Sequence, residues 1–192
     1  IPIIGDAKRG DIGNTAKAYA KALFDILDFD AVTVNPYGGH DALEPFLDYR
    51  DRGVIIWCRS SNPGAADFQG VLNENGVPLY QVVAQKAGEW NEHRNVGLVM
   101  AATYPNELKK VRELCPEMPI LVPGIGAQAG DLEASVLNGV DKNGERAIFT
   151  SSRQILYASQ GTDFPESVFD GWQVESLRRQ ALSFAKGQID LR

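Results

Sequence analysis

Short apolar runs alternate with longer amphipathic stretches along this chain. The apolar runs predict six strands, over residues 1–5, 31–34, 54–58, 96–101, 120–122 and 147–150. Between the first two strands, apolar residues recur at helical spacing from Ala16 to Leu27, and Asn14 stands where an N-cap would accept a backbone amide. Further helices are predicted over residues 41–52, 79–90, 106–114, 131–138 and 166–186. Strands that alternate with helices in this way are typical of a parallel sheet.

The order of these elements leaves two architectures open. Residues 60–78 contain several glycines and prolines, which predicts a long surface loop and turn. The six strand–helix units fit either a doubly wound sheet or a (β/α)8 barrel that lacks its first two units. No strand-to-helix turn carries the G-x-G-x-x-G pattern of dinucleotide-binding folds. No linker or low-complexity tract divides the chain, so we expect one domain over residues 1–192.

Composition narrows the classes of protein. The 192 residues are 44% hydrophobic, which is enough for one substantial core. A net charge of -6 argues against a nucleic-acid-binding surface, because such surfaces cluster Lys and Arg. No run of about 18 apolar residues occurs, so we expect no membrane span. Cys58 and Cys115 lack partners at metal-ligand spacing and are expected to be buried reduced thiols, which favours a soluble cytoplasmic protein.

Polar residues gather directly after five of the predicted strands. They are Asp6 and Lys8, Asn35 and Pro36, Arg59 to Ser61, Pro123 to Gly126, and Ser151 to Arg153. Active sites of (β/α)8 barrels are built on the rim that the carboxyl ends of the strands form. Five strands therefore direct polar chemistry to one rim, which favours the barrel.

The first of these segments carries closely spaced charges. Strand alternation puts Asp6 and Lys8 on the same face, so a carboxylate and an ammonium share the rim if that face is the interior. Such a pair is either a structural salt bridge that closes the barrel top or a catalytic pair. Asp11 adds a third charge, and an alternating charge array can keep a lysine protonated while it crowds an anionic substrate.

Residues 3–16 contain the pattern D-x-K-x-x-D-I-x-x-T. This pattern resembles the signature of the orotidine 5'-phosphate decarboxylase family, and the resemblance continues in the family's order through residues 34–39, 59–64, 123–128 and 151–155. Residues 6–11 and 139–144 resemble the type 2 branch of that family. The resemblance implies a (β/α)8 barrel of which this chain holds strands 3 to 8. It also implies removal of CO2 from orotidine 5'-phosphate, which gives uridine 5'-phosphate (UMP) in pyrimidine biosynthesis.

The resemblance implies roles for the residues of the first motif. Lys8 matches the lysine that protonates C6 of the pyrimidine as CO2 departs, and Asp6 matches the carboxylate next to the substrate carboxylate. In the family, Asp11 and Thr15 reach across a two-fold dimer interface into the neighbouring subunit's site, so a homodimer is expected. Ile12 of the same motif is taken as a further substrate-binding residue.

Later segments match contacts to the nucleotide. Ser61 matches the serine that hydrogen-bonds the pyrimidine, and Gln128 matches the glutamine that bridges base and phosphate. Arg153, with the backbone amide it shares with Ser152, matches the phosphate clamp, and barrels commonly bind phosphate after strands seven and eight. Asn35 either orients the lysine or caps the turn that follows it, and the sequence leaves both readings open.

The resemblance also bears on cofactors and on the extent of the protein. The sequence shows no thiamine, pyridoxal or metal site, so no cofactor is expected. Residues 1–4 already read as a buried strand. The family would place two strand–helix units before them, with a ribose-contacting aspartate and a second lysine, so we expect a preceding segment in the intact protein. Fusion to an orotate phosphoribosyltransferase is left open.

Two other functions remain as alternatives. 3-keto-gulonate-phosphate decarboxylases and hexulose-phosphate synthases share the D-x-K-x-x-D rim but use Mg2+. A non-catalytic barrel fragment that only binds nucleotide is the second alternative. Residues 61–64 and Gln128, which match nucleotide contacts, favour the nucleotide decarboxylase.

Overall fold

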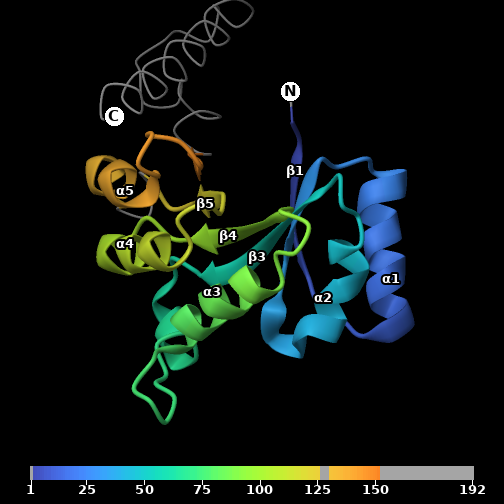
Figure 1. Cartoon of the computed structure of the whole chain (residues 1–192), viewed down its shortest axis with the longest axis horizontal. Coiled ribbons are helices and arrows are strands. Elements are labelled where there is room, and N and C mark those ends of the chain that lie inside the picture. Colours follow the sequence, from blue (N-terminus) through green and yellow to red (C-terminus); the bar gives the residue numbers. More distant parts are fainter. Residues whose placement is uncertain (1, 126–129, 152–192) are drawn as a thin grey trace, which may run out of the picture.

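Six parallel strands form one sheet whose order follows the sequence, β1-β2-β3-β4-β5-β6 (Figure 1). The computed structural model describes residues 2–125 and 130–151. The strands are β1 (Ile4–Arg9), β2 (Ala31–Val34), β3 (Gly53–Arg59), β4 (Val96–Met100), β5 (Ile120–Val122) and β6 (Ala147–Phe149). A doubly wound sheet reverses its strand order at a switch point. This sheet does not reverse within the described residues, so the units are those of a (β/α)8 barrel.

A helix follows each of the first five strands. The α-helices are α1 (Gly13–Lys21), α2 (His40–Leu47), α3 (Leu79–Glu89), α4 (Pro105–Leu114) and α5 (Leu132–Gly139). Three shorter helices are the π-helix η1 (Ala22–Ile26) and the 3-10 helices η2 (Pro36–Gly38) and η3 (Pro63–Asp67). None of the described helices is long and apolar enough to cross a membrane.

The two faces of the sheet bury different sets of side chains. The larger core lies between the sheet and the helices, and its strand members include Val32, Val34, Val54, Ile56, Cys58, Val96, Leu98, Met100, Ile120 and Val122. A smaller cluster of Ile55, Val99 and Leu121 forms on the opposite face, with Ile4, Ala31 and Trp57 packed against it. That opposite face is the interior of the barrel, because side chains alternate along each strand and the helices cover the other face.

The first strand differs from its predicted bounds. We expected residues 1–5, whereas β1 runs from Ile4 to Arg9 and carries the charged motif inside the strand. The apolar run ends at Gly5, but pairing with β2 continues to Arg9, so the neighbouring strand and not hydrophobicity decides where β1 ends.

The predicted N-cap of the first helix is also wrong. Helix α1 begins at Gly13 and its N-cap is Ile12, which makes no side-chain cap, so Asn14 lies inside the helix. Just before α1, the Asp11 carboxylate accepts a hydrogen bond from the Ile12 backbone N–H at 2.8 Å.

The remaining predicted elements agree with the structure apart from their ends. β2 and β5 have the predicted bounds. Residues 60–78 connect β3 to α3 as expected, and they contain the short helix η3. Cys58 and Cys115 are free and buried. The helix expected over residues 166–186 lies outside the described residues.

Candidate active site

The charged motif lies on an irregular part of β1. Gly5 pairs with Val32 and Arg9 pairs with Val34, so three residues of β1 stand opposite the single residue between Val32 and Val34. Lys8, the last of the three, has a φ of 47°, in the left-handed region that L residues seldom adopt. Irregularities of this kind redirect side chains near active sites.

Asp6 and Lys8 are in direct contact. The Lys8 Nζ lies 2.5 Å from Asp6 Oδ1 and 2.6 Å from Asp6 Oδ2, so the ammonium donates to both oxygens of the carboxylate. The Lys8 side chain is 36% exposed and that of Asp6 is 63% exposed, so both reach solvent at the carboxyl end of β1. The prediction that strand alternation puts the two residues on one face is confirmed.

A threonine of the neighbouring strand joins this pair. Thr33 of β2 is fully buried, and its hydroxyl donates to Asp6 Oδ1 at 2.9 Å. The same Oγ1 accepts the backbone N–H of Lys8 at 3.0 Å. Sequence reasoning missed Thr33. The available signal was a polar residue at an interior position of the apolar run Ala31–Val34.

The contacts of Asp6 favour its ionised form. Partial burial raises the pKa of Asp6, but hydrogen bonds from Lys8 and Thr33 and the charge of Lys8 outweigh that effect. The pKa of Asp6 therefore lies below its usual value. Asp6 is therefore ionised near neutral pH, beside the Lys8 side chain.

Trp57 of β3 lies beside the pair on the interior face. Its ring centroid is 5.9 Å from the Lys8 Nζ, within the range of a cation–π contact. Trp57 also packs against the interior cluster of Ile55, Val99 and Leu121. Its ring thereby also forms a wall next to the ammonium.

Asp11, Ile12 and Thr15 follow β1 into the start of α1. Ile12 and Thr15 are exposed, with Ile12 at 66%. No hydrogen bond or ion pair joins Asp11 to Lys8 within the described residues, so in a single chain Asp6 alone pairs with the lysine.

Asn35 caps a turn. Its Oδ1 accepts the N–H of Tyr37 at 2.9 Å and thereby caps the short helix η2. Of the two readings that the sequence left open, capping is therefore the one that the structure shows.

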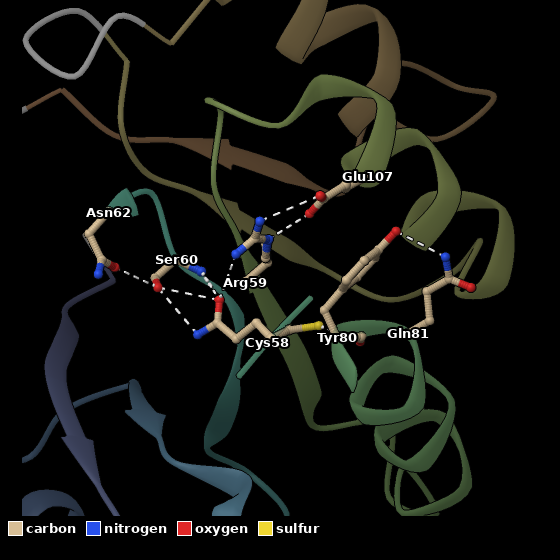
Figure 2. A network of polar contacts seen from close by, with 8 residues as sticks. Cys58, Arg59, Ser60, Asn62, Tyr80, Gln81 and Glu107 are labelled. Atoms are coloured by element: carbon tan, nitrogen blue, oxygen red, sulfur yellow. Dashed lines mark hydrogen bonds and ion pairs between the residues drawn. The ribbon is translucent and has the colours of Figure 1, made fainter. Parts of the chain in front are cut away.

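The end of β3 is held by a polar network around Arg59 (Figure 2). Arg59 is 4% exposed, its Nε donates to Glu107 Oε2 at 2.6 Å, and its guanidinium lies 3.9 Å from the ring centroid of Tyr104. Gln69 Oε1 accepts from Arg59 Nη1 at 3.3 Å and from the Ser60 N–H at 2.9 Å. A buried guanidinium with a hydrogen bond from each of its three nitrogens fixes the positions of its partners.

Ser61 follows directly after this network. The Ser60 hydroxyl donates to Asn62 Oδ1 at 2.8 Å, so the residues on both sides of Ser61 are tied to each other. The structure therefore gives Ser61 a defined backbone at the rim. Sequence reasoning missed Gln69, which lies midway along the same loop, residues 60–78.

Gln128, Ser152 and Arg153 lie outside the described residues. Ser151, directly before the expected phosphate clamp, is described and buried, two residues after β6.

The sequence is similar to known decarboxylases. The sequence model of the "Orotidine 5'-phosphate decarboxylase / HUMPS family" matches residues 1–163. A protein of Dehalococcoides mccartyi named orotidine 5'-phosphate decarboxylase is 55% identical over 166 residues, which cover 85% of this chain and 62% of that protein. The chain thus spans about three fifths of the length of the curated relatives that it matches.

Solved structures agree with the sequence comparison. The OMP decarboxylase of Leishmania donovani has a TM-score of 0.83 and 35% identity, and the match covers 98% of this chain and 69% of that one. The UMP synthase of the same organism has a TM-score of 0.82 and 37% identity, with 97% of this chain and 39% of that one covered. With its barrel strand order and its Asp6–Lys8 pair at the rim, the chain belongs to the orotidine 5'-phosphate decarboxylase / HUMPS family.

Proposed function

We propose that the intact protein containing this chain decarboxylates orotidine 5'-phosphate to UMP in de novo pyrimidine biosynthesis. The observation that carries the proposal is the Lys8 ammonium, which is paired with Asp6 at the carboxyl end of β1. The names of the relatives that are 54–55% identical support the same reaction.

The proposed reaction needs a cation close to the carbon that loses its carboxylate. The bond between C6 and the carboxyl carbon breaks, CO2 leaves, and the electron pair stays on C6. The Lys8 ammonium stabilises that developing charge and then transfers a proton to C6, after which water restores the proton to Lys8. A fixed charge aimed at a developing charge is usually the largest catalytic contribution. The Asp6 carboxylate, crowded against the substrate carboxylate, adds stress to the ground state.

Contacts to the rest of the nucleotide hold C6 in position. We assign the pyrimidine to Ser61, the base and phosphate to Gln128, and the phosphate to Ser152 and Arg153. Binding energy from groups remote from the reacting carbon can be used for positioning. The tied backbone on both sides of Ser61 supports its part of this assignment.

We further propose that the active protein is a homodimer. Asp11 and Thr15 then reach into the neighbouring subunit's site, and Ile12 contacts substrate there. The 66% exposure of Ile12 supports a partner surface at this place. A partner chain at this place would remove the apolar Ile12 side chain from water, which is favourable.

The chain is proposed to form one barrel domain, strands 3 to 8, with a preceding segment that supplies the ribose-contacting aspartate and a second lysine. Its 62% coverage of the D. mccartyi relative supports that extent. Fusion to an orotate phosphoribosyltransferase is supported only by the similarity to a UMP synthase. Two buried free cysteines support a cytoplasmic location.

The test follows the loss of orotidine 5'-phosphate absorbance by the intact protein with EDTA present. Lys8→Ala should abolish turnover and leave binding of UMP measurable. Lys86→Ala is the matched control, because among the described residues Lys86 forms an ion pair with Glu89 alone, on the exposed surface of α3. Near-normal decarboxylation by the Lys8 variant would refute the assignment.

The second candidate is a Mg2+-dependent sugar-phosphate decarboxylase or aldolase. The description of the matching family includes a second name, HUMPS, besides the orotidine enzyme. Activity on a sugar phosphate that EDTA abolishes, with none on orotidine 5'-phosphate, would establish this candidate in place of the first.

A further inference from the structure

The β1–β2 pairing leaves Thr33 opposite three residues. Between the pairs Gly5–Val32 and Arg9–Val34, β1 contains Asp6, Ala7 and Lys8, whereas β2 contains Thr33 alone. A regular parallel ladder pairs one residue with one. The excess residues interrupt that ladder at the point where the reacting lysine stands.

The Thr33 hydroxyl replaces the missing ladder contact. The backbone N–H of Lys8 donates to Thr33 Oγ1 at 3.0 Å, where a regular strand would offer a carbonyl oxygen. Lys8 has a φ of 47°, a conformation that persists only when surrounding contacts hold it. Thr33 therefore stabilises the backbone from which the ammonium projects.

The same hydroxyl also orients the carboxylate. Thr33 Oγ1 donates to Asp6 Oδ1 at 2.9 Å, and Asp6 accepts from the Lys8 Nζ. One oxygen atom thus connects the backbone of Lys8 to the partner of its side chain. Because Thr33 is fully buried at 0% exposure, its side chain is sealed from the solvent that the substrate would displace.

We propose that Thr33 is a positioning residue that sets the geometry of the Asp6–Lys8 pair through its hydroxyl. The inference rests on the proposed decarboxylation for its catalytic consequence. A misplacement of about 1 Å at a reacting group can lower a rate about a hundredfold. The proposal therefore predicts an effect on kcat, with little effect on KM.

The test compares Thr33→Val, which removes the hydroxyl at constant volume, with Thr33→Ser, which keeps it. Thr33→Val should lower kcat about tenfold to a hundredfold and leave KM nearly unchanged. Thr33→Ser should retain most of kcat. Ser135→Ala is the control, because the Ser135 hydroxyl is buried and has no hydrogen-bond partner in the part of the chain that the structure describes.

The pH profile gives a readout that loss of structure alone would not move. Thr33 is the polar neighbour that β2 contributes to Asp6, Lys8 is its charged contact, and β3 presents the uncharged Trp57 beside Lys8. The Thr33 hydrogen bond favours ionised Asp6, so its removal raises the pKa of Asp6. The acid limb of kcat should then move to higher pH in Thr33→Val and stay in place in Thr33→Ser.

Amide hydrogen exchange of Lys8 separates this inference from the proposed function. Faster exchange at the Lys8 amide in Thr33→Val, with protection kept in Thr33→Ser, supports the positioning contact. If the unmodified protein leaves orotidine 5'-phosphate intact, that result refutes only the proposed function and not the contact. If Thr33→Val does not fold, the pair Thr33→Ser and Thr33→Ala makes the same comparison. An active protein in which removal of the hydroxyl alters neither kcat nor Lys8 exchange overturns the inference.

Discussion

Replacement of Arg112 by methionine should destabilise the fold by several kcal/mol. Arg112 of α4 is 8% exposed, and its guanidinium donates five hydrogen bonds to backbone carbonyl oxygens. The acceptors are Gly139 at 2.8 Å, Cys115 at 3.1 Å, Pro116 at 3.2 Å, Met118 at 2.8 Å and Arg146 at 2.8 Å. One side chain thus joins the end of α4 to the end of α5 and to the segments that enter β5 and β6.

The size of the effect follows from what each carbonyl loses. The oxygens of Cys115 and Arg146 also accept backbone N–H groups, and Pro116 is exposed to water. Gly139 and Met118 are buried, so two carbonyls lose their partner at about 1–3 kcal/mol each, or about 2–6 kcal/mol together. The methionine avoids the desolvation cost of the guanidinium, which offsets part of this loss. We therefore expect about 3 kcal/mol.

The assay is urea unfolding of the intact protein. When the slope m, the dependence of the unfolding free energy on urea concentration, is equal between variants, a change in the midpoint reports a change in stability. Arg50→Met is the control, because Arg50 is exposed and its side chain makes no polar contact within the described residues, and it should change stability by less than about 0.5 kcal/mol. Arg112→Lys should lose less stability than Arg112→Met and more than Arg50→Met, because an ammonium has three donors and lacks the planar geometry of a guanidinium. An Arg112→Met variant as stable as Arg50→Met would refute the reasoning.

Two further predictions concern the rim loop and acid stability. Gln69→Leu removes the acceptor of the Ser60 N–H and should weaken UMP binding about tenfold, as measured by titration calorimetry. The control Gln85→Leu, on the exposed surface of α3, should bind UMP as the unmodified protein does. Equal affinities of the two variants would contradict the role of Gln69. The backbone N–H of Glu145 lowers the pKa of Asp141 against the effect of burial, with help from the Asn143 N–H. A lowered folded pKa contributes stability above the ordinary value of about 3.9, and this is lost as pH falls through the folded pKa. Asp141→Asn should therefore flatten the acid limb of the stability–pH curve measured by thermal unfolding, and an unchanged slope would contradict this.

The sequence predicts most of the sheet because apolar runs define buried strands. The bounds of β2 and β5 were predicted correctly, since each is an apolar run buried on both faces. The end of β1 was not, because the strand continues through charged residues that a hydrophobic pattern excludes. Pairing with β2 holds those residues in the sheet, and such pairing is a tertiary interaction that the local pattern does not contain.

The candidate site shows the same division. The contact between Asp6 and Lys8 was predictable, because two residues at spacing i, i+2 share a face of one strand. The contacts of Thr33 and Gln69 were not, since each depends on register or on the path of a loop. Within one element, sequence spacing gives geometry, whereas between elements the folded backbone gives it.

The two arginines that are buried in the described part of the chain, Arg59 and Arg112, act at opposite ends of the barrel, which separates their effects on stability and on function. Arg59 lies at the carboxyl end of β3, next to Ser60 and the rim. Arg112 binds carbonyls of Met118 and Arg146, which lie just before β5 and β6, at the amino ends of the strands. Barrel chemistry occurs at the carboxyl ends, while the amino ends serve stability. Changes at Arg112 should therefore lower the unfolding midpoint more than kcat/KM, and changes to the partners of Arg59 should do the reverse.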